Sequence, residues 1–491
     1  MDIKQLLQMQ TKRGAKISGV SERNKTTIQE VISKCRKELE EKSERYRDLP
    51  VEEKKSMIRQ LIIDFVMNEK PLVDGYISGD NIPDTIKLTD KLIEAITNYD
   101  FLTEAMNDDS VNEIRANGRW IKVEKNGKIV DLTDSSGNIL FFHDPEQQEI
   151  IMKKLLGDVR CNPANAIVSA TTIEGYRMQA IHSSALGVDP KDPHGEKYSA
   201  FVLRKFKDER PELSDIVKYG TMSDDMAKAL ELFAKGYVSV FTVGPTSSGK
   251  TTTNTAFVNA IDDMRVLLIQ NPSEIDGRKR DETGRVVNDV LHLEAHDVTN
   301  PKPSDPTAVN LMDASLRLSP RYIVFGEWRT NEEFEYGMKL LLAGHPINST
   351  YHSDSVKAAF KRFLVAYATS SKQPPELAAQ TLADNMDIVI CQRFMNDGSR
   401  KVLEIGEIVG VDNTEPIINM LYMFIPGEPT YDEAGKLVAI NGEHKRVGTI
   451  SEKLQRKFAI AGIKKSQYKF LTVPVEQSRE EQTYTGNVTL G

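Results

Sequence analysis

Cysteines are few in this chain, and long apolar runs are missing. Cys35, Cys161 and Cys391 are far apart among 491 residues, and no CxxC or Cys/His metal-ligand spacing occurs. This usage predicts reduced thiols in a cytoplasmic protein. No apolar stretch approaches the roughly 18 residues needed to cross a bilayer. Residues 1–16 also lack the apolar segment of a signal peptide. We therefore expect no transmembrane segment, and any work at a membrane to go through a partner.

An excess of basic residues is also missing. The chain has 64 Lys and Arg against 72 Asp and Glu, which gives a formal net charge of −8. The basic footprint of a nucleic-acid-binding protein is therefore absent at the level of the whole chain, although a local basic patch stays open. Hydrophobic residues make up 39% and charged residues 28%, as in a soluble globular protein with a core. The length suggests about three domains.

Residues 1–99 read as a helical N-terminal region. The segment 36–55 mixes basic and acidic side chains, which is typical of a solvated helix face; a specific charge-reading role is the less favoured alternative. An apolar stripe follows at helical spacing, and we expect it to pack against the next domain. Its members are Met57, Ile58, Leu61, Ile62 and Phe65.

Residues 100–208 read as an α+β domain. From residue 110 the apolar period changes to two, and the Asn-Gly pairs 117–118 and 126–127 lie between alternating strands. Asn-Gly suits the positive φ angles of two-residue hairpin turns, so the segment predicts a three-stranded meander. Residues 166–182 and 198–206 predict further strands.

After a linker with short helices at 209–230, residues 231–430 alternate strands with helices. The fold class that this pattern favours is α/β, with a sheet covered on both faces. Residues 431–491 read as a polar C-terminal extension with one short helix, frayed after 475. The candidate strands are 237–243, 265–270, 290–296, 322–326, 347–351 and 387–394.

The segment "GPTSSGKTT" carries the strongest motif. It fits Gly-x-x-x-x-Gly-Lys-Thr, follows an apolar strand and leads into a helix, the context that a phosphate-binding loop requires. Lys250 is expected to reach the β- and γ-phosphates of ATP, and the Thr251 hydroxyl to bind Mg²⁺. A plain Gly-Ser turn is the rejected alternative. The residues predicted to bind nucleotide are Gly244, Pro245, Thr246, Ser247, Ser248, Gly249, Lys250, Thr251 and Thr252.

A second candidate is Glu327, which ends the apolar strand in "SPRYIVFGEWRT". A carboxylate at that place can orient a water molecule and accept its proton, a role worth about 10²–10⁴ in rate. A glutamate at a strand end is more often only solvated. Its position after a phosphate-binding loop in an α/β pattern favours the catalytic reading.

With these motifs in place, the chain resembles the secretion-superfamily ATPases of type II and type IV secretion and pilus assembly. The resemblance is strongest to the tight-adherence (Tad/Flp) pilus and conjugation branch and covers roughly residues 100–465. It rests on four motifs in the family's order. They are the phosphate loop, the Asp box "LLIQNPSEI", the Walker B segment "SLRLSPRYIVFGEWR" and the histidine box "AGHPINSTYHSDS".

The resemblance implies a protomer with an α+β N-domain and a RecA-like motor domain, closing into a homo-hexamer with ATP and Mg²⁺ at the domain interface. It assigns catalytic positions to Glu274 of the Asp box, to His352 of the histidine box and to Arg317 before Walker B. Arg204 matches an N-domain arginine that is expected to face the phosphates. His345 fills the other histidine-box position.

The Asp box departs from the family pattern. Relatives usually carry Glu-Asp where this chain has Gln270 and Asn271. Neutral amides can form hydrogen bonds but cannot act as bases or strong metal ligands. Arg321 replaces an aspartate after the Walker B proline, and His296 replaces an arginine. We expect an active but slow ATPase, and a site without turnover stays open.

The resulting hypothesis is a cytoplasmic ATPase motor that drives pilus assembly or type II/IV secretion. It is expected to be peripheral to the inner membrane, docked on a polytopic platform protein, with no direct nucleic-acid partner. One alternative is a nucleotide-binding ring scaffold with weak or no hydrolysis. A nucleic-acid translocase is another, and the acidic net charge counts against it. Cargo, direction of action and ring stoichiometry stay open.

Overall fold

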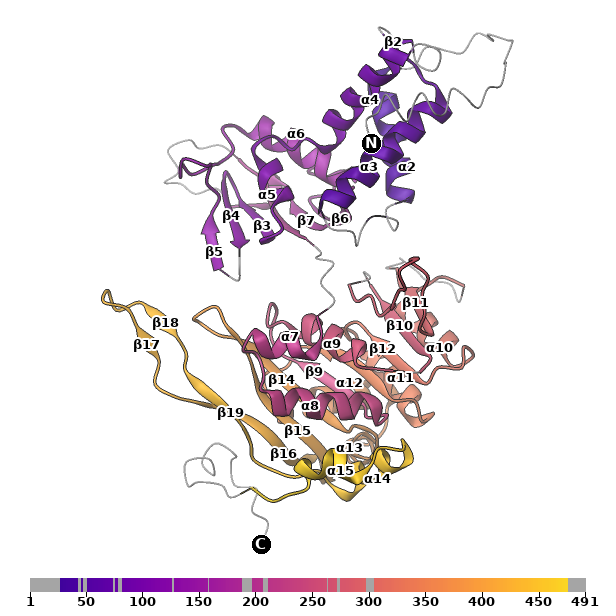
Figure 1. The fold of residues 1–491 in the computed structure, drawn as a ribbon, viewed down its shortest axis with the longest axis vertical. Helices are drawn as coiled ribbons and strands as arrows, with labels where there is room; N and C mark the ends of the chain where they lie inside the picture. The colour runs from indigo at the N-terminus through magenta and orange to yellow at the C-terminus, as the bar shows by residue number, and fades with distance from the viewer. Residues whose placement is uncertain are drawn as a thin grey trace. The chain divides into compact units, whose positions relative to one another are not determined.

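The computed structural model shows a chain divided into two compact units, residues 1–209 and 210–491 (Figure 1). Each unit has its own sheet and hydrophobic core. Among the described residues, no helix is long and apolar enough to cross a membrane. The structure describes residues 27–42, 46, 51–73, 76–77, 82–125, 128–157, 159–187, 197–205, 211–262, 264–271, 274–296 and 304–475.

Helices open the first unit, as the sequence predicts. They are α2 (Ile28–Glu41), α3 (Val51–Glu69) and α4 (Ile82–Thr97), with a two-stranded pair β1 (Leu72–Val73) and β2 (Tyr76–Ile77). The stripe predicted on α3 is confirmed: four of its five residues are buried and Met57 packs against them. Ile173 of the following α+β region belongs to the same core, so the helices pack on that region.

A six-stranded antiparallel sheet forms the rest of the first unit. Its order is β5-β4-β3-β8-β7-β6, which confirms the predicted meander. The predicted hairpin is present, but its two-residue loop is Gly118-Arg119, because Asn117 pairs with Trp120 as the last residue of β3; Gly118 has a φ of 67°. The turn predicted at 126–127 lies outside the described residues. The elements are α5 (Thr103–Asn107), β3 (Val111–Asn117), β4 (Trp120–Lys125), β5 (Lys128–Asp131), α6 (Pro145–Leu156), β6 (Ile167–Thr171), β7 (Arg177–Ile181) and β8 (Ala200–Arg204).

The second unit is built on a nine-stranded sheet of order β11-β10-β12-β13-β9-β14-β15-β16-β19. The first six strands run parallel, and all six strands predicted between 237 and 394 are confirmed. They are β9 (Val240–Val243), β10 (Val266–Gln270), β11 (Val290–Glu294), β12 (Tyr322–Phe325), β13 (Ile347–Tyr351) and β14 (Ile388–Phe394).

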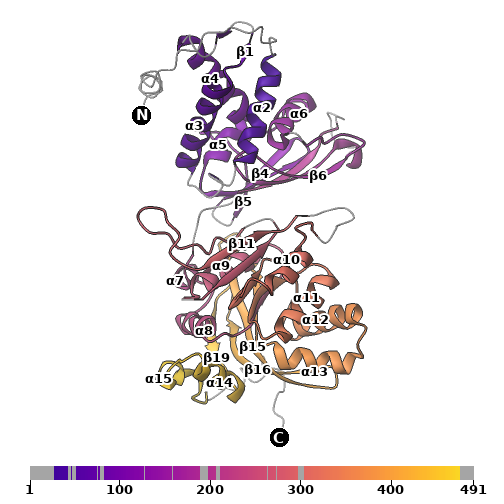
Figure 2. The same ribbon diagram turned by 90° about the vertical axis from the view of Figure 1, so that its right-hand side faces the viewer.

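Helices cover both faces of this sheet, as the apolar strands predict (Figure 2). Alternate strand residues enter two different cores: Val240 and Leu268 face one, and Phe241 and Ile269 face the other. The first core includes α7 (Leu213–Lys218), α8 (Asp224–Lys235) and α9 (Lys250–Asn259). The second includes α10 (Ala308–Ser315), α11 (Asn331–Leu342), α12 (Val356–Ser371) and α13 (Pro375–Asn385). The α/β fold class is thereby shown.

The C-terminal part extends the sheet with antiparallel strands β15 (Arg400–Asp412), β16 (Glu415–Pro426) and β19 (Gly442–Arg446). A hairpin of β17 (Thr430–Tyr431) and β18 (Leu437–Ala439) projects from β16 and β19 (Figure 1). The helices α14 (Glu452–Ile460) and α15 (Lys465–Tyr468) follow.

Two segments that were predicted to lie outside the domain at 231–430 pack into the same core as that domain. Leu213 and Ile216 belong to the stretch predicted as a linker, and Leu454 and Phe458 to the predicted extension; all four are buried with the sheet. At the sheet, buried Asp387 accepts a hydrogen bond from the Ser239 amide and pairs with Lys457 and Lys453 of α14. The domain boundaries themselves stay predictions, and residues 476–491 lie outside the description.

Candidate nucleotide site

The phosphate-binding loop joins the central strand β9 to helix α9. Its backbone takes left-handed conformations at Ser247, with a φ of 64°, and at Gly249, with a φ of 91°. Gly249 is the N-cap of α9, and no side chain caps that helix. A helix that begins in this way presents backbone N–H groups and the positive end of its dipole to an anion.

Lys250 lies folded against the loop. Its side chain is buried, and Nζ donates to the carbonyl oxygens of Gly244 and Pro245 at 2.9 and 3.0 Å. The Ser248 hydroxyl is fully buried and has no hydrogen-bond partner. An orphaned buried hydroxyl in the loop is the kind of group that a bound oxyanion would satisfy. Thr251 is half-buried in the first turn of α9.

Glu327 follows β12, two strands from the loop. Its Oε2 lies 2.8 Å from Nε of Arg329, and its Oε1 lies 3.2 Å from Nε2 of His352. His352 follows β13, the strand between β12 and β9, and its Nδ1 lies 3.2 Å from the carbonyl oxygen of Gly244. One imidazole therefore joins the candidate base to the phosphate-binding loop.

The two contacts of His352 constrain which of its ring nitrogens can donate. A carbonyl oxygen only accepts, so Nδ1 of His352 carries a proton in its bond to Gly244. The contact between Nε2 and Oε1 is a hydrogen bond only when one more proton lies between Glu327 and His352. The guanidinium of Arg329 lies against the other carboxylate oxygen, so Glu327 is held at both of its oxygens. Each oxygen of Glu327 keeps a further lone pair for a water molecule.

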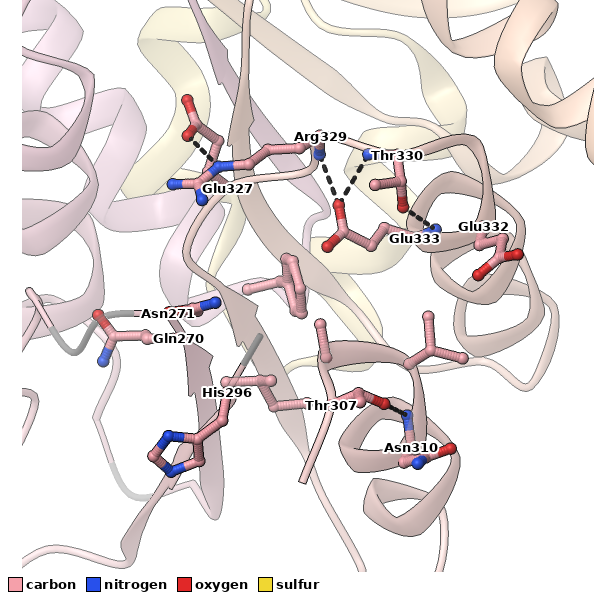
Figure 3. A pocket seen from close by; sticks show the side chains of 14 residues that line it. Gln270, Asn271, His296, Thr307, Asn310, Glu327, Arg329, Thr330, Glu332 and Glu333 are labelled. Atoms are coloured by element: carbon pink, nitrogen blue, oxygen red, sulfur yellow. Dashed lines mark hydrogen bonds and ion pairs between the residues drawn. The ribbon is translucent and has the colours of Figure 1, made fainter. Parts of the chain in front are cut away.

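A cavity of about 320 Å³ lies beside Glu327, at the carboxyl ends of β10 and β12 (Figure 3). In Figure 3, Glu327 and Arg329 lie on one side of it and Thr307 and Asn310 of the α10 start on the other. Arg329 is fixed through its backbone, because its N–H donates to Glu333 Oε2 at 2.6 Å. The sequence reasoning missed Arg329, although Thr-x-x-Glu at 330–333 is a capping-box signature.

Gln270 lines the cavity and also holds the Asp-box loop through its amide. It is 3% exposed, and its Oε1 accepts from the amides of Glu274 and Ile275 at 3.0 and 2.7 Å. Its Nε2 donates to the carbonyl oxygen of Ile275 at 2.9 Å. A carboxylate could not make that donated bond, so the neutral amide has a structural use at this position. Asn271 and His296 line the cavity (Figure 3), and Pro272 of the box lies outside the described residues.

The structure brings some of the predicted residues together and leaves others apart. Lys250 and His352 both contact the Gly244 carbonyl oxygen, and Glu327 contacts His352. The Arg317 side chain, just after α10, is instead 76% exposed and pairs with Asp313. No contact that the structure describes joins Arg317 to Glu327. Arg204 ends β8 in the first unit, so its approach to the phosphates stays a prediction. Glu274 also stays a predicted catalytic residue.

Two further residues contact the loop and were missed by the sequence reasoning. Gln392 of β14 donates from Nε2 to the Ser248 carbonyl oxygen, and Arg400 of β15 donates from Nε to that of Ser247. The signal for Gln392 in the sequence is weak: it is a polar residue that directly follows four apolar residues of the strand. The structure shows no group of three or more His, Cys, Asp or Glu side chains placed as metal ligands within the part of the chain it describes.

Residues 192–416 match the family model described as "Type II/IV secretion system protein". Among curated proteins, the chain is 28% identical over 251 residues to an uncharacterized protein of Methanocaldococcus jannaschii, a match that covers 50% of this chain and 41% of that protein. It is 29% identical over 191 residues to the protein VirB11 of Agrobacterium fabrum, covering 38% of this chain and 51% of VirB11. The chain thus spans about half the length of these relatives.

Among solved structures, the ATPase DotB of Legionella pneumophila aligns over 64% of this chain and 80% of its own, with 19% identity and a TM-score of 0.42. The matched segment 192–416 contains the phosphate-binding loop, Glu327 and His352. Residues 192–416 are therefore similar to the type II/IV secretion system protein family, in the part of the chain that carries these motifs.

Proposed function

We propose that this protein is an ATP-hydrolysing motor. The observation that carries the proposal is the link from Glu327 through His352 to Gly244. It connects a candidate base with the loop that would hold the phosphates, across three neighbouring parallel strands. A glutamate that is merely solvated at a strand end does not need a partner at each carboxylate oxygen, whereas Glu327 contacts Arg329 at one and His352 at the other.

In the proposed reaction, Glu327 orients a water molecule and takes its proton as the water oxygen attacks the γ-phosphorus. The bond between the γ-phosphorus and the β,γ-bridging oxygen breaks, so that ADP leaves and inorganic phosphate is formed. Arg329 and His352 hold the two carboxylate oxygens, so Glu327 stays in one orientation. Positioning of this kind and stabilisation of charge are the main catalytic effects in phosphoryl transfer. The carboxylate side chain of Glu327 is only 25% exposed, which limits the water that competes for it.

The loop residues fit a nucleotide phosphate. Lys250 brings a cation to the loop, the orphaned Ser248 hydroxyl offers a donor, and α9 begins without a side-chain cap. For Mg²⁺, the Thr251 hydroxyl is the protein ligand we propose. Such an ion typically binds few protein groups and is held largely by phosphate oxygens and water, where it neutralises charge. That fits a site without a dedicated carboxylate cluster.

We further propose that the motor works as a homo-hexamer beside a membrane. ATP binding and release of products would move the first unit against the second, and a platform protein of a secretion or pilus machine would receive that motion. The motif resemblance and the similarity to VirB11 support this part of the proposal.

A ring scaffold with little hydrolysis is the second candidate, favoured by the neutral Asp box. The bonds of Gln270 weaken that support, because its amide closes a loop and does not stand in for a missing carboxylate. Asn271 remains the altered position beside Glu327 in the cavity. We therefore favour hydrolysis.

The test is Mg²⁺-dependent phosphate release by the purified protein, alongside Lys250→Ala and Glu327→Gln. If the protein hydrolyses ATP, the unmodified protein should release phosphate and both variants should not. Glu327→Gln should still bind ATP. Arg317→Gln tests the catalytic role predicted for that residue, whose exposed side chain lies just after α10; unchanged turnover would argue against that role. An unmodified protein that binds ATP without turnover above that of both variants would contradict the motor and favour the scaffold.

A further inference from the structure

Strand β14 lies directly beside β9 and runs parallel to it. Its residue Gln392 stands where the pairing register with β15 shifts, because Cys391 pairs with Glu404 and Gln392 with Val402. Gln392 is 1% exposed, although it carries a polar amide. A buried amide needs hydrogen-bond partners, and those of Gln392 lie in the phosphate-binding segment.

The side chain of Gln392 joins the loop to helix α9. Its Nε2 donates to the carbonyl oxygen of Ser248 at 2.8 Å, and its Oε1 accepts from the hydroxyl of Thr253 at 2.7 Å. Both bonds are buried, and their partners are 144 and 139 residues away in sequence. One amide therefore ties the end of the loop to the second half-turn of the helix that follows it.

The backbone of Gln392 contacts the other end of the loop. A Cβ added at Gly244 would lie 2.1 Å from the Gln392 carbonyl oxygen, and one at Gly249 would lie 2.8 Å from its Nε2. Both glycines of the motif are thus required by contact with the same residue. Gly249 also has a left-handed φ, whereas Gly244 has a φ of 157°, so contact is the main constraint there.

Arg400 adds a second contact from the same hairpin. Its Nε donates to the carbonyl oxygen of Ser247 at 3.1 Å, and its guanidinium lies over the Phe394 ring. Ser247 has a left-handed φ of 64°, a conformation that is unfavourable for a residue other than glycine unless its surroundings hold it. The β14–β15 hairpin thus holds two successive carbonyl groups, those of Ser247 and Ser248, away from the inside of the loop.

We propose that Gln392 is a positioning residue for nucleotide binding, which keeps the phosphate-binding loop open with its N–H groups directed inward. It acts through Ser248 and Thr253 and touches no nucleotide itself. The inference rests on the proposed function only in requiring that the loop binds a nucleoside diphosphate or triphosphate. It also identifies the β14–β15 hairpin as the element through which the C-terminal strands can influence nucleotide affinity.

The test is the dissociation constant of a fluorescent ADP analogue for the full-length chain with Mg²⁺. Gln392→Glu keeps the shape and the acceptor for Thr253 but sets a carboxylate against the Ser248 carbonyl oxygen. At pH 8 we expect the affinity for the analogue to fall about 10- to 100-fold, because the buried hydrogen bond to the Ser248 carbonyl oxygen is lost and that oxygen is left without its donor. At pH 6 a protonated carboxyl can donate again, so affinity should recover relative to the unmodified protein at the same pH.

Gln373→Glu is the matched control, because its amide donates to the Tyr367 hydroxyl and makes no described contact with the loop. It should bind the analogue like the unmodified protein at both pH values. Thr253→Val and Thr253→Ser provide a second pair in case Gln392→Glu does not fold. Valine removes the hydroxyl that donates to Gln392 and should weaken binding, whereas serine keeps it and should not.

Folded Gln392→Glu protein that binds the analogue normally at pH 8, or binds weakly without recovery at pH 6, would overturn the inference. So would equal affinities of the two Thr253 variants. Failure of the proposed motor gives a different pattern, because phosphate release would be missing while the pH-dependent affinity of Gln392→Glu persisted. An unmodified protein that does not bind the analogue would overturn both.

Discussion

His352 lies between Glu327 and the phosphate-binding loop, with Nε2 3.2 Å from Glu327 Oε1 and Nδ1 3.2 Å from the Gly244 carbonyl oxygen. The arrangement follows from strand order, because His352 ends the strand that separates the other two. A shift of the loop would therefore move the imidazole, and with it one of the two groups that hold the carboxylate. The phosphate-binding loop and the Glu327 carboxylate are thus linked through one side chain.

Replacing His352 with alanine should reduce turnover more than nucleotide affinity. Glu327 would keep Arg329 at Oε2 and lose its partner at Oε1. Hydrogen bonds to charged groups contribute about 1.5–3 kcal/mol, so kcat should fall on the order of 10- to 100-fold. Steady-state kinetics with ATP and a binding titration measure the two effects. A variant that loses affinity while retaining kcat would show that the histidine serves binding alone.

Changing Gln270 to glutamate should destabilise the protein instead of improving it, although it restores the residue usual in relatives. The new carboxylate would be buried and could no longer donate to the Ile275 carbonyl oxygen. Leaving that acceptor unsatisfied costs about 1–3 kcal/mol. Denaturant unfolding at pH 7 measures the change. Equal or greater stability, together with faster turnover, would instead identify Gln270 as a weakened catalytic position.

The ring of Trp328, the residue that follows Glu327, packs so closely on α11 that position 337 has room only for glycine. A Cβ at position 337 would lie 2.4 Å from Cζ2 of Trp328, which is buried among aromatic rings. Alanine improves helix propensity by about 1 kcal/mol, but overpacking against a fixed ring costs about 1–3 kcal/mol. We expect Gly337→Ala to lower both the thermal midpoint and kcat. Unchanged kinetics would mean that Trp328 can move without displacing Glu327.

Glu407 should make stability fall as pH rises. Burial raises its pKa above the ordinary value of 4.5, while bonds from Ser451 and Asn419 only partly oppose the effect. Because the folded-state pKa is higher than the unfolded one, its contribution is complete below about 4.5 and is lost as pH rises through the folded value. Glu407→Gln can keep these bonds, with its amide donating to the Ser451 hydroxyl. It should be as stable as the unmodified protein at low pH and more stable at pH 7 to 8.

Chemical unfolding from pH 4 to pH 8 measures this difference. Glu443→Gln is the control, because it removes an exposed carboxylate from β19 of the same sheet. A pH dependence that is the same in Glu407→Gln and the unmodified protein would rule out Glu407 as its source.

Local patterns predicted the elements and the central motif well. The strands around 237–394 are apolar enough to identify, and the loop at 244–251 has a fixed spacing. The contacts of Gln392 could not be predicted, because they depend on β14 lying beside β9 and join residues 139 and 144 positions apart. The strand β19 could not be predicted for a different reason: its sequence "GEHKR" lacks the alternating apolar residues that indicate a strand.

The Asp box shows where a resemblance is a weaker guide than geometry. Neutral residues at 270 and 271 suggested a slowed or inactive site. At Gln270 both ends of the amide serve the Glu274–Ile275 backbone, a role that sequence comparison cannot separate from lost catalysis. His352 was identified only by the resemblance, because a single histidine after a strand carries no local signal of its partners.

The most direct test of the account is Mg²⁺-dependent phosphate release from ATP, measured in parallel with ATP binding for the unmodified protein, Lys250→Ala and Glu327→Gln. The account predicts turnover in the unmodified protein, loss of binding and turnover in Lys250→Ala, and retained binding without turnover in Glu327→Gln. Turnover in Glu327→Gln equal to that of the unmodified protein would contradict the account, because the carboxylate held by His352 and Arg329 would then have no part in the reaction.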